Sequence, residues 1–95
     1  MPSGNKSGSE PESKSGSEPD LLRALAHLER GDWQAAHEIV QRDEESPLAC
    51  WAHGIVHLME GDTGNARYWY GRAERPFRDD SSEEIQAFRE KLIGL

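Results

Sequence analysis

Three polar side chains in the middle of the chain have the types and the spacing for metal chemistry. His53 and His57 are four residues apart, and Glu60 follows three residues after His57. Successive residues of a helix turn by about 100°, so all three fall on one side of a helix. Two histidines at this spacing can chelate Zn²⁺, for which a carboxylate is a further ligand.

Two interpretations of this histidine face are open, and the sequence favours the one without metal. A zinc site needs another ligand, and His27, which precedes a similar turn, would have to supply it. No HExxH motif is present to provide a general base. We therefore expect solvated or interhelical hydrogen-bonding histidines, no metal, no cofactor and no catalytic residue. His53, His57 and Glu60 are then candidates for contact with a protein partner.

A second set of chemically interesting side chains lies in the segment GNARYWYGRAERP, residues 64–76. Its three consecutive aromatic residues cannot share one helix face, because each is rotated by about 100° from the next. On a helical wheel, Trp69 and Tyr70 fall on the side of the small residue Ala66, which is the side expected to face the core. Tyr68 falls on the opposite side.

The outward Tyr68 is accompanied on the wheel by Arg72, Arg75 and Asn65. A tyrosine beside arginines can stack on a planar group and pair with a carboxylate or phosphate. Residues 67–78 also carry four arginines against one glutamate, in a chain of formal net charge −7. One interpretation is a patch that binds an acidic partner. The other is that Tyr68 packs on Arg72 or on the last helix, while nearby carboxylates neutralise the arginines.

Helices must position both sets of residues, since apolar residues recur at helical spacing from Asp20 onward. The first apolar stripe stops at Gly31, and Asp32 is a natural N-cap for the next helix. Thirty residues further on, Gly61 and Asp62 repeat this turn, and the stripes on either side recur in register. The sequence therefore predicts two copies of one helical hairpin.

A fifth helix is predicted over residues 81–93. Ser81 with Glu84 three residues later is a capping-box pattern. The apolar residues that follow form a narrow stripe, Ile85, Phe88 and Leu92. One apolar side and one charged side are typical of the terminal cap of a helical stack.

Residues 20–76 resemble the tetratricopeptide repeat family. The resemblance is strongest in the second unit, which has in order Trp51, Gly54, Gly61, Asp62, Ala66, Tyr70, Ala73 and Pro76. Large and small packing positions alternate in this way so that paired helices approach closely, and Gly54 and Gly71 are expected to mark such contacts. The resemblance implies a scaffold that binds peptides or protein surfaces along one face, without catalysis. Two repeats are few, so the last helix or a homodimer is expected to cover the interior.

The expected organisation is one all-α domain of five helices behind a low-complexity tail. Residues 1–19 contain no apolar residue after Met1 and are predicted to be disordered. Repeat one is placed at 20–45, repeat two at 46–76 and the capping helix at 81–93.

Composition bounds the function further. The net charge of −7 argues against a general affinity for nucleic acid, and no apolar run is long enough for a membrane span. A single cysteine excludes an internal disulfide framework, so a reducing, cytoplasmic location is expected. We therefore expect a non-catalytic module that binds a protein or peptide. The alternative is a metal-dependent or small-anion-binding protein that uses the face of His53, His57 and Glu60.

Overall fold

The computed structural model describes residues 18–94, and this part of the chain is built from helices without any strand. The helices are α1 (Glu18–Glu29), α2 (Trp33–Val40), α3 (Pro47–Glu60), α4 (Thr63–Arg72) and α5 (Ser81–Ile93). The predicted all-α class and the five helices are therefore confirmed. The tail predicted at residues 1–19 falls almost entirely outside the described residues, and α1 begins two residues before Asp20.

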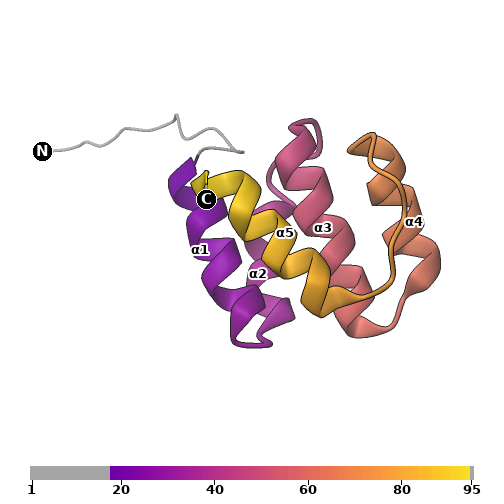
Figure 1. The fold of residues 1–95 in the computed structure, drawn as a ribbon, viewed down its shortest axis with the longest axis horizontal. Helices are drawn as coiled ribbons and strands as arrows, with labels where there is room; N and C mark the ends of the chain where they lie inside the picture. Colours follow the sequence, from indigo (N-terminus) through magenta and orange to yellow (C-terminus); the bar gives the residue numbers. More distant parts are fainter. Residues whose placement is uncertain (1–17, 95) are drawn as a thin grey trace, which may run out of the picture.

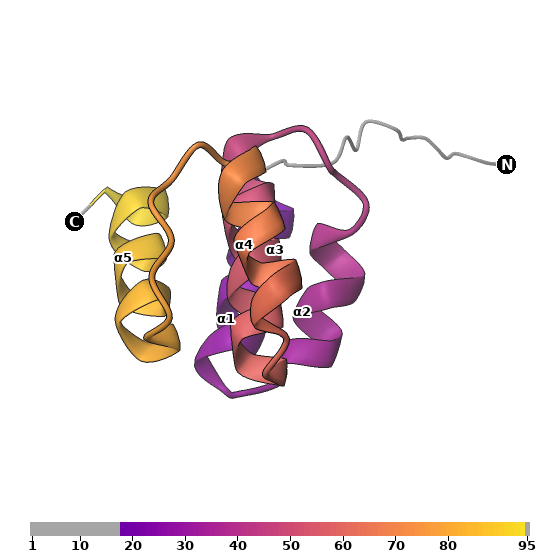
Figure 2. The ribbon, with the colours of Figure 1, turned by 90° about the vertical axis from the view of Figure 1, so that its right-hand side faces the viewer.

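The helices form two hairpins and a closing helix (Figure 1). α1 packs on α2, α3 packs on α4, and α1 and α3 are also in contact with each other. Figure 2 shows α2 and α5 on opposite sides of α1 and α3. Contact between α2 and α3 therefore joins the hairpins on one side, and α5 spans them on the other. Within residues 18–94, no helix combines the length and apolar character that crossing a membrane requires.

Both hairpins contain the same turn. Gly31 and Gly61 adopt the left-handed conformation, with φ of 78° and 89°, which glycine tolerates because it has no Cβ. The next backbone amide donates to a carbonyl five residues back, at 2.8 Å in both Asp32–His27 and Asp62–His57. Each aspartate side chain then caps the following helix by accepting from a backbone amide, that of Ala35 or Asn65. One Gly-Asp pair thus ends one helix and starts the next.

The apolar stripes of all five helices meet in one core. Its largest fully buried side chains are Trp51, Tyr70, Phe88, Leu28, Ile55, Val40 and Val56. α3 is the central element, since every residue from Ala49 to His57 is buried. A Cβ built on Gly54 would lie 2.5 Å from the Tyr70 ring, so the expected close contact of α3 with α4 is confirmed there. The same expectation is wrong for Gly71, whose Cβ would meet nothing within 4 Å.

A buried carboxyl group fixes α5 to the second hairpin. Oε1 of Glu84 accepts from the indole N–H of Trp51 at 3.0 Å and from the Tyr70 hydroxyl at 2.6 Å. The Phe88 ring packs edge-on against Trp51, with 5.2 Å between ring centroids. On the other hairpin, the Arg89 guanidinium lies 3.1 Å from the Glu29 carboxylate. α5 therefore closes the stack through polar contacts as well as an apolar stripe.

The capping box predicted for α5 is wrong. The N-cap is Asp80, whose side chain accepts from the amide of Glu83 at 3.1 Å. Ser81 is the first residue of the helix. Glu84 does not serve the cap because its carboxyl group is taken up by the two core donors.

Candidate functional site

The outer face of α4 presents Tyr68 and Arg72. Tyr68 is 53% exposed, whereas its neighbours Trp69 and Tyr70 are buried, as the helical wheel predicts. The Arg72 guanidinium donates to the Tyr68 hydroxyl at 3.2 Å and to the backbone carbonyl of Glu44, which lies between α2 and α3. It also lies 5.8 Å from the centroid of the Trp69 ring. These contacts hold a guanidinium beside an exposed tyrosine where the two hairpins meet. The alternative that Tyr68 packs on Arg72 is therefore confirmed for this hydrogen bond.

Arg75 is not placed as the wheel predicts. α4 ends at Arg72, and Glu74 has a φ of 59°, so the chain leaves the helical path before Arg75. The Arg75 guanidinium lies instead 3.4 Å from the centroid of the Trp51 ring, a cation–π contact on the side of α5. The predicted patch of Tyr68, Arg72 and Arg75 is therefore corrected to the Tyr68–Arg72 pair.

Asn65, the fourth residue of the predicted patch, is exposed in the first turn of α4. Its side-chain amide donates to the Asp62 carboxylate at 2.7 Å. The side chain thus supports the N-terminal cap of α4 and presents its remaining polar atoms at the helix start.

The arginines at positions 67, 72, 75 and 78 form no salt bridge with any carboxylate within residues 18–94. Arg67 lies over the Phe77 ring at 4.3 Å, as Arg75 does over Trp51. Nearby acidic side chains are engaged in the fold: Asp80 caps α5 and Glu84 bonds core donors. The internal salt bridges considered from the sequence are therefore not found for these four arginines within residues 18–94.

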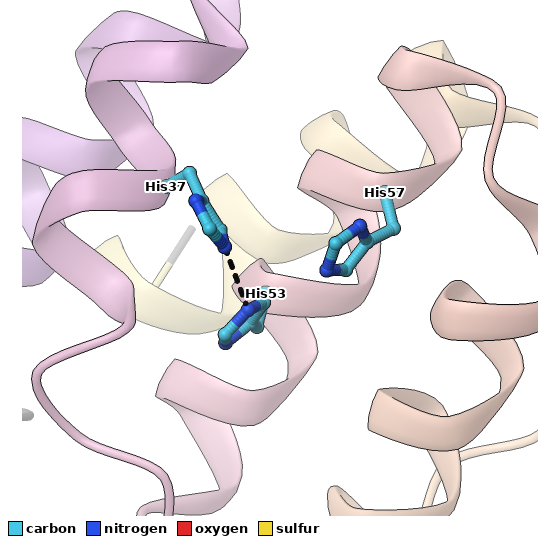
Figure 3. Close-up of side chains that lie close together, drawn as sticks. All are labelled: His37, His53 and His57. Atoms are coloured by element: carbon cyan, nitrogen blue, oxygen red, sulfur yellow. Dashed lines mark hydrogen bonds between the residues drawn. The ribbon is translucent and has the colours of Figure 1, made fainter.

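α2 and α3 bring three histidines together, as Figure 3 shows. The Nε2 atoms of His37 and His53 are hydrogen-bonded at 3.1 Å, so one ring donates and the other accepts. The His57 ring centroid lies 5.5 Å from that of His37 and 5.2 Å from that of His53. His53 and His57 are only 3% and 8% exposed, and His37 is half-buried. The expected interhelical hydrogen bonding is therefore confirmed for His53, through His37. The prediction that His53 and His57 contact a partner is wrong in this geometry, because both side chains are buried.

His27, the expected third ligand, is not in this cluster. It lies at the end of α1, where its Nδ1 is 3.1 Å from the Arg30 guanidinium and 3.6 Å from the Asp32 carboxylate. The third member is His37, which a wheel of α3 cannot reveal because it belongs to another helix. The sequence held one indication that His37 lies near the core. It is placed between Ala36 and Val40, which are the buried residues of α2.

Glu60 fixes the orientation of the His57 ring. The Glu60 carboxylate lies 3.0 Å from Nδ1 of His57. An ionised carboxylate can only accept, so Nδ1 carries the hydrogen and Nε2 of the neutral ring carries the lone pair. This carboxylate–histidine arrangement is the one that supports metal-binding histidines in proteins.

His53 is the most enclosed member of the cluster. The Trp69 ring stacks on it in parallel, with 3.9 Å between centroids. Burial, followed by the nearby imidazoles of His37 and His57, lowers the pKa of His53 to about 3. The ring is therefore neutral at physiological pH. Its buried Nδ1 has no hydrogen-bond partner within the described chain.

The remaining reactive group, Cys50, has a structural role. Its side chain is fully buried, and its thiol donates to the Glu44 carbonyl at 3.4 Å. Burial raises the pKa of this thiol, which keeps it in the less reactive protonated form. Two surface hollows, of 260 and 250 Å³, lie at α5, one beside Glu29 and the other beside Arg75. Neither is lined by a cysteine or histidine.

Comparison with models of protein families matched none of them, and comparisons with curated proteins and with solved structures likewise found no match. The tetratricopeptide resemblance therefore stays a prediction from the sequence. Function must be argued from the two features described above, the Tyr68–Arg72 pair and the histidine cluster.

Proposed function

We propose that the domain is a non-catalytic interaction module that binds an acidic protein or peptide at the Tyr68–Arg72 pair. The observation that carries this proposal is that Arg72 is held by Tyr68 and the Glu44 carbonyl yet has no carboxylate partner within residues 18–94. The scaffold in this proposal is a pair of tetratricopeptide-like hairpins in a cytoplasmic protein.

The chemistry of the pair fits a binding surface. Tyrosine and arginine are among the residues that contribute most to protein interfaces. The two hydrogen bonds of Arg72 leave further N–H groups of the guanidinium for a partner carboxylate. Because the guanidinium is already positioned, its binding costs less side-chain entropy than that of an unrestrained arginine. Asn65, one turn before Tyr68 on the exposed side of α4, extends the surface.

An acidic partner also agrees with the charges around the site. Arg72 places a positive charge beside Tyr68 in a chain with net charge −7, while Arg67 lies over Phe77 and Arg75 over Trp51. Such local charge accelerates association with an acidic surface, whereas the charge of the whole chain disfavours nucleic acid. A second copy of this acidic chain is one possible partner, and the homodimer expected from the sequence is a version of the same proposal.

Affinity capture with matched variants tests the proposal. The wild-type domain and a Tyr68→Ala/Arg72→Ala variant are each immobilised and exposed to extract of the source organism. The control is Leu22→Ala/Arg23→Ala, which removes an exposed apolar and an exposed cationic side chain from α1, at the other end of the stack (Figure 1).

We expect a partner that wild type and the α1 control retain and the α4 variant loses, with weaker capture at high salt. Equal capture by all three proteins, or equal loss from both variants, contradicts the proposal. Sizing of the wild type and the α4 variant by light scattering distinguishes self-association from binding to another protein.

The alternative of a metal-dependent or small-anion-binding protein is favoured by one observation, the convergence of imidazole groups at His53 and His57. Glu60 supports this cluster through His57. The two features share Trp69, whose ring stacks on His53 and lies 5.8 Å from the Arg72 guanidinium.

A further inference from the structure

The histidine cluster joins two helices from different hairpins. One ring nitrogen of each of His37, His53 and His57 lies within 4.8 Å of the others. In a tetrahedral zinc site with Zn–N bonds of about 2.0–2.1 Å, ligand nitrogens are separated by about 3.3 Å. The Nε2 atoms of His37 and His53 are already 3.1 Å apart. The His57 ring points toward the same space (Figure 3), and one of its nitrogens lies within 4.8 Å of a ring nitrogen of each of the other two histidines.

The ring nitrogens have lone pairs to offer. The Glu60 carboxylate fixes the hydrogen of His57 on Nδ1, which leaves Nε2 as the ligand atom. His53 is almost fully buried, and its Nε2 faces Nε2 of His37. Within the His37–His53 bond only one of the two Nε2 atoms carries a hydrogen.

A purely structural role has to account for three imidazole groups enclosed together. Nδ1 of the almost fully buried His53 has no hydrogen-bond partner among the described residues, and a ligand bound through Nε2 leaves that atom as it is. What favours a shared ligand is the convergence of the three imidazole groups on one space, with the Glu60 carboxylate behind His57.

We propose that His37, His53 and His57 bind one divalent transition-metal ion of the Zn²⁺ type between α2 and α3. Imidazole nitrogen suits Zn²⁺ and its first-row neighbours, and Glu60 orients His57 from outside the coordination shell. If both His37 and His53 bind through Nε2, the hydrogen between them moves to Nδ1 of the donor ring. This transfer between the two nitrogens of one ring releases no proton, because the hydrogen stays on that ring.

The ion would connect the two hairpins through side chains. His37 belongs to the first hairpin and the other two ligands to the second. Three protein ligands leave a fourth position for water or a partner side chain. This inference differs from the expectation of no metal drawn from the sequence. That expectation takes His27 as the further ligand, whereas the structure brings His37 to His53 and His57. The proposed ligands are different residues from those of the Tyr68–Arg72 pair, although Trp69 contacts both sets.

Calorimetric titration of the metal-free full chain with Zn²⁺ tests the site. We expect one ion per chain with a dissociation constant below the micromolar range. His37→Gln should weaken binding more than the 10–100-fold that is typical for loss of an outer-shell partner. His27→Gln is the matched control, since it removes a histidine outside the cluster, and should bind as the wild type does. Circular dichroism confirms that each variant is folded.

The His37→Gln variant separates this site from a surface alternative, and two Glu60 variants test the role of that carboxylate. His57, Glu60 and Asp62 also offer ligand atoms within 4.8 Å of one another. If the ion binds there, His37→Gln leaves the affinity unchanged, and the proposal is overturned. At the proposed site Glu60→Gln keeps an acceptor for His57 and should weaken binding less than Glu60→Ala, for which we expect a 10–100-fold loss.

Trp69 supplies an optical readout because it stacks on His53. Co²⁺ added in place of Zn²⁺ should quench part of the tryptophan fluorescence. In Trp69→Phe this quenching should be absent, because the quenched tryptophan is missing. The visible absorption of bound Co²⁺ should show the intense bands of tetrahedral coordination. Absence of binding to a folded wild type, or quenching that His37→Gln leaves intact, overturns the proposal.

Discussion

At the scale of single residues, Glu84 is the polar group on which the junction with α5 depends. It is 5% exposed and accepts from both Trp51 and Tyr70. Burial, followed by the hydrogen bond to this carboxyl group, raises the pKa of Tyr70. Nothing in the apolar pattern of the sequence predicts this contact, since all three residues belong to different helices.

Glu84→Ala should destabilise the domain by about 2–4 kcal/mol, because it leaves two buried donors without an acceptor. Glu84→Gln keeps a carbonyl oxygen at the same place and should cost about 1 kcal/mol. Urea unfolding at neutral pH measures both values. Equal losses for the two variants would show that the charge, and not the acceptor, stabilises this junction.

The lowered pKa of His53 makes the metal-free domain sensitive to acid. Between the folded pKa of about 3 and the ordinary value near 6.5, the unfolded chain binds a proton that the folded chain does not. The free energy of unfolding should therefore fall by about 2 kcal/mol from pH 7 to pH 5 through this group. Urea unfolding in chelator at several pH values measures the slope. The His27→Gln variant should show the same dependence of the unfolding free energy on pH as the wild type. An unchanged dependence in His53→Gln would show that His53 is not its source.

At the scale of elements, α4 has two distinct faces. Trp69 and Tyr70 are buried against α3, while Tyr68 is exposed. The 100° rotation between neighbours was enough to predict this division from the sequence. The same rule failed for Arg75 because it holds only while the helix continues, and α4 ends at Arg72.

Alanine substitutions should separate the two faces of α4. Trp69→Ala removes a large buried ring and should cost about 3–5 kcal/mol, enough to unfold much of so small a domain. Tyr68→Ala should cost under about 1 kcal/mol, since its ring is half in solvent. Thermal unfolding followed by circular dichroism compares them. Similar losses would show that Tyr68 is structural.

Two helical glycines should respond to alanine with opposite signs. Gly54→Ala drives a methyl group into the Tyr70 ring, at 2.5 Å in the present geometry, and should be destabilising because α3 and α4 must separate. Gly71→Ala meets nothing within 4 Å and should stabilise by up to about 1 kcal/mol through helix propensity. Urea midpoints measure the difference, and destabilisation by both would disprove the packing explanation.

At the scale of the whole molecule, the sequence predicts features that are periodic within one helix or repeated along the chain. The five helices, their buried stripes and the paired Gly-Asp turns follow from such patterns. Contacts between distant segments do not, and these include the Glu84 junction and the meeting of His37 with His53. Both proposed sites lie at the contact between the two hairpins, through Glu44 for Arg72 and through α2 for the histidines.

The central claim is that one face of α4 stabilises the fold while the other binds a partner. The most direct measurement is the affinity of the captured partner for wild type and Tyr68→Ala, with unfolding free energy measured on the same samples. We expect affinity to fall at least about tenfold, equivalent to about 1.4 kcal/mol of binding, while stability changes by less than about 1 kcal/mol. Unchanged affinity in a folded Tyr68→Ala variant would contradict the claim.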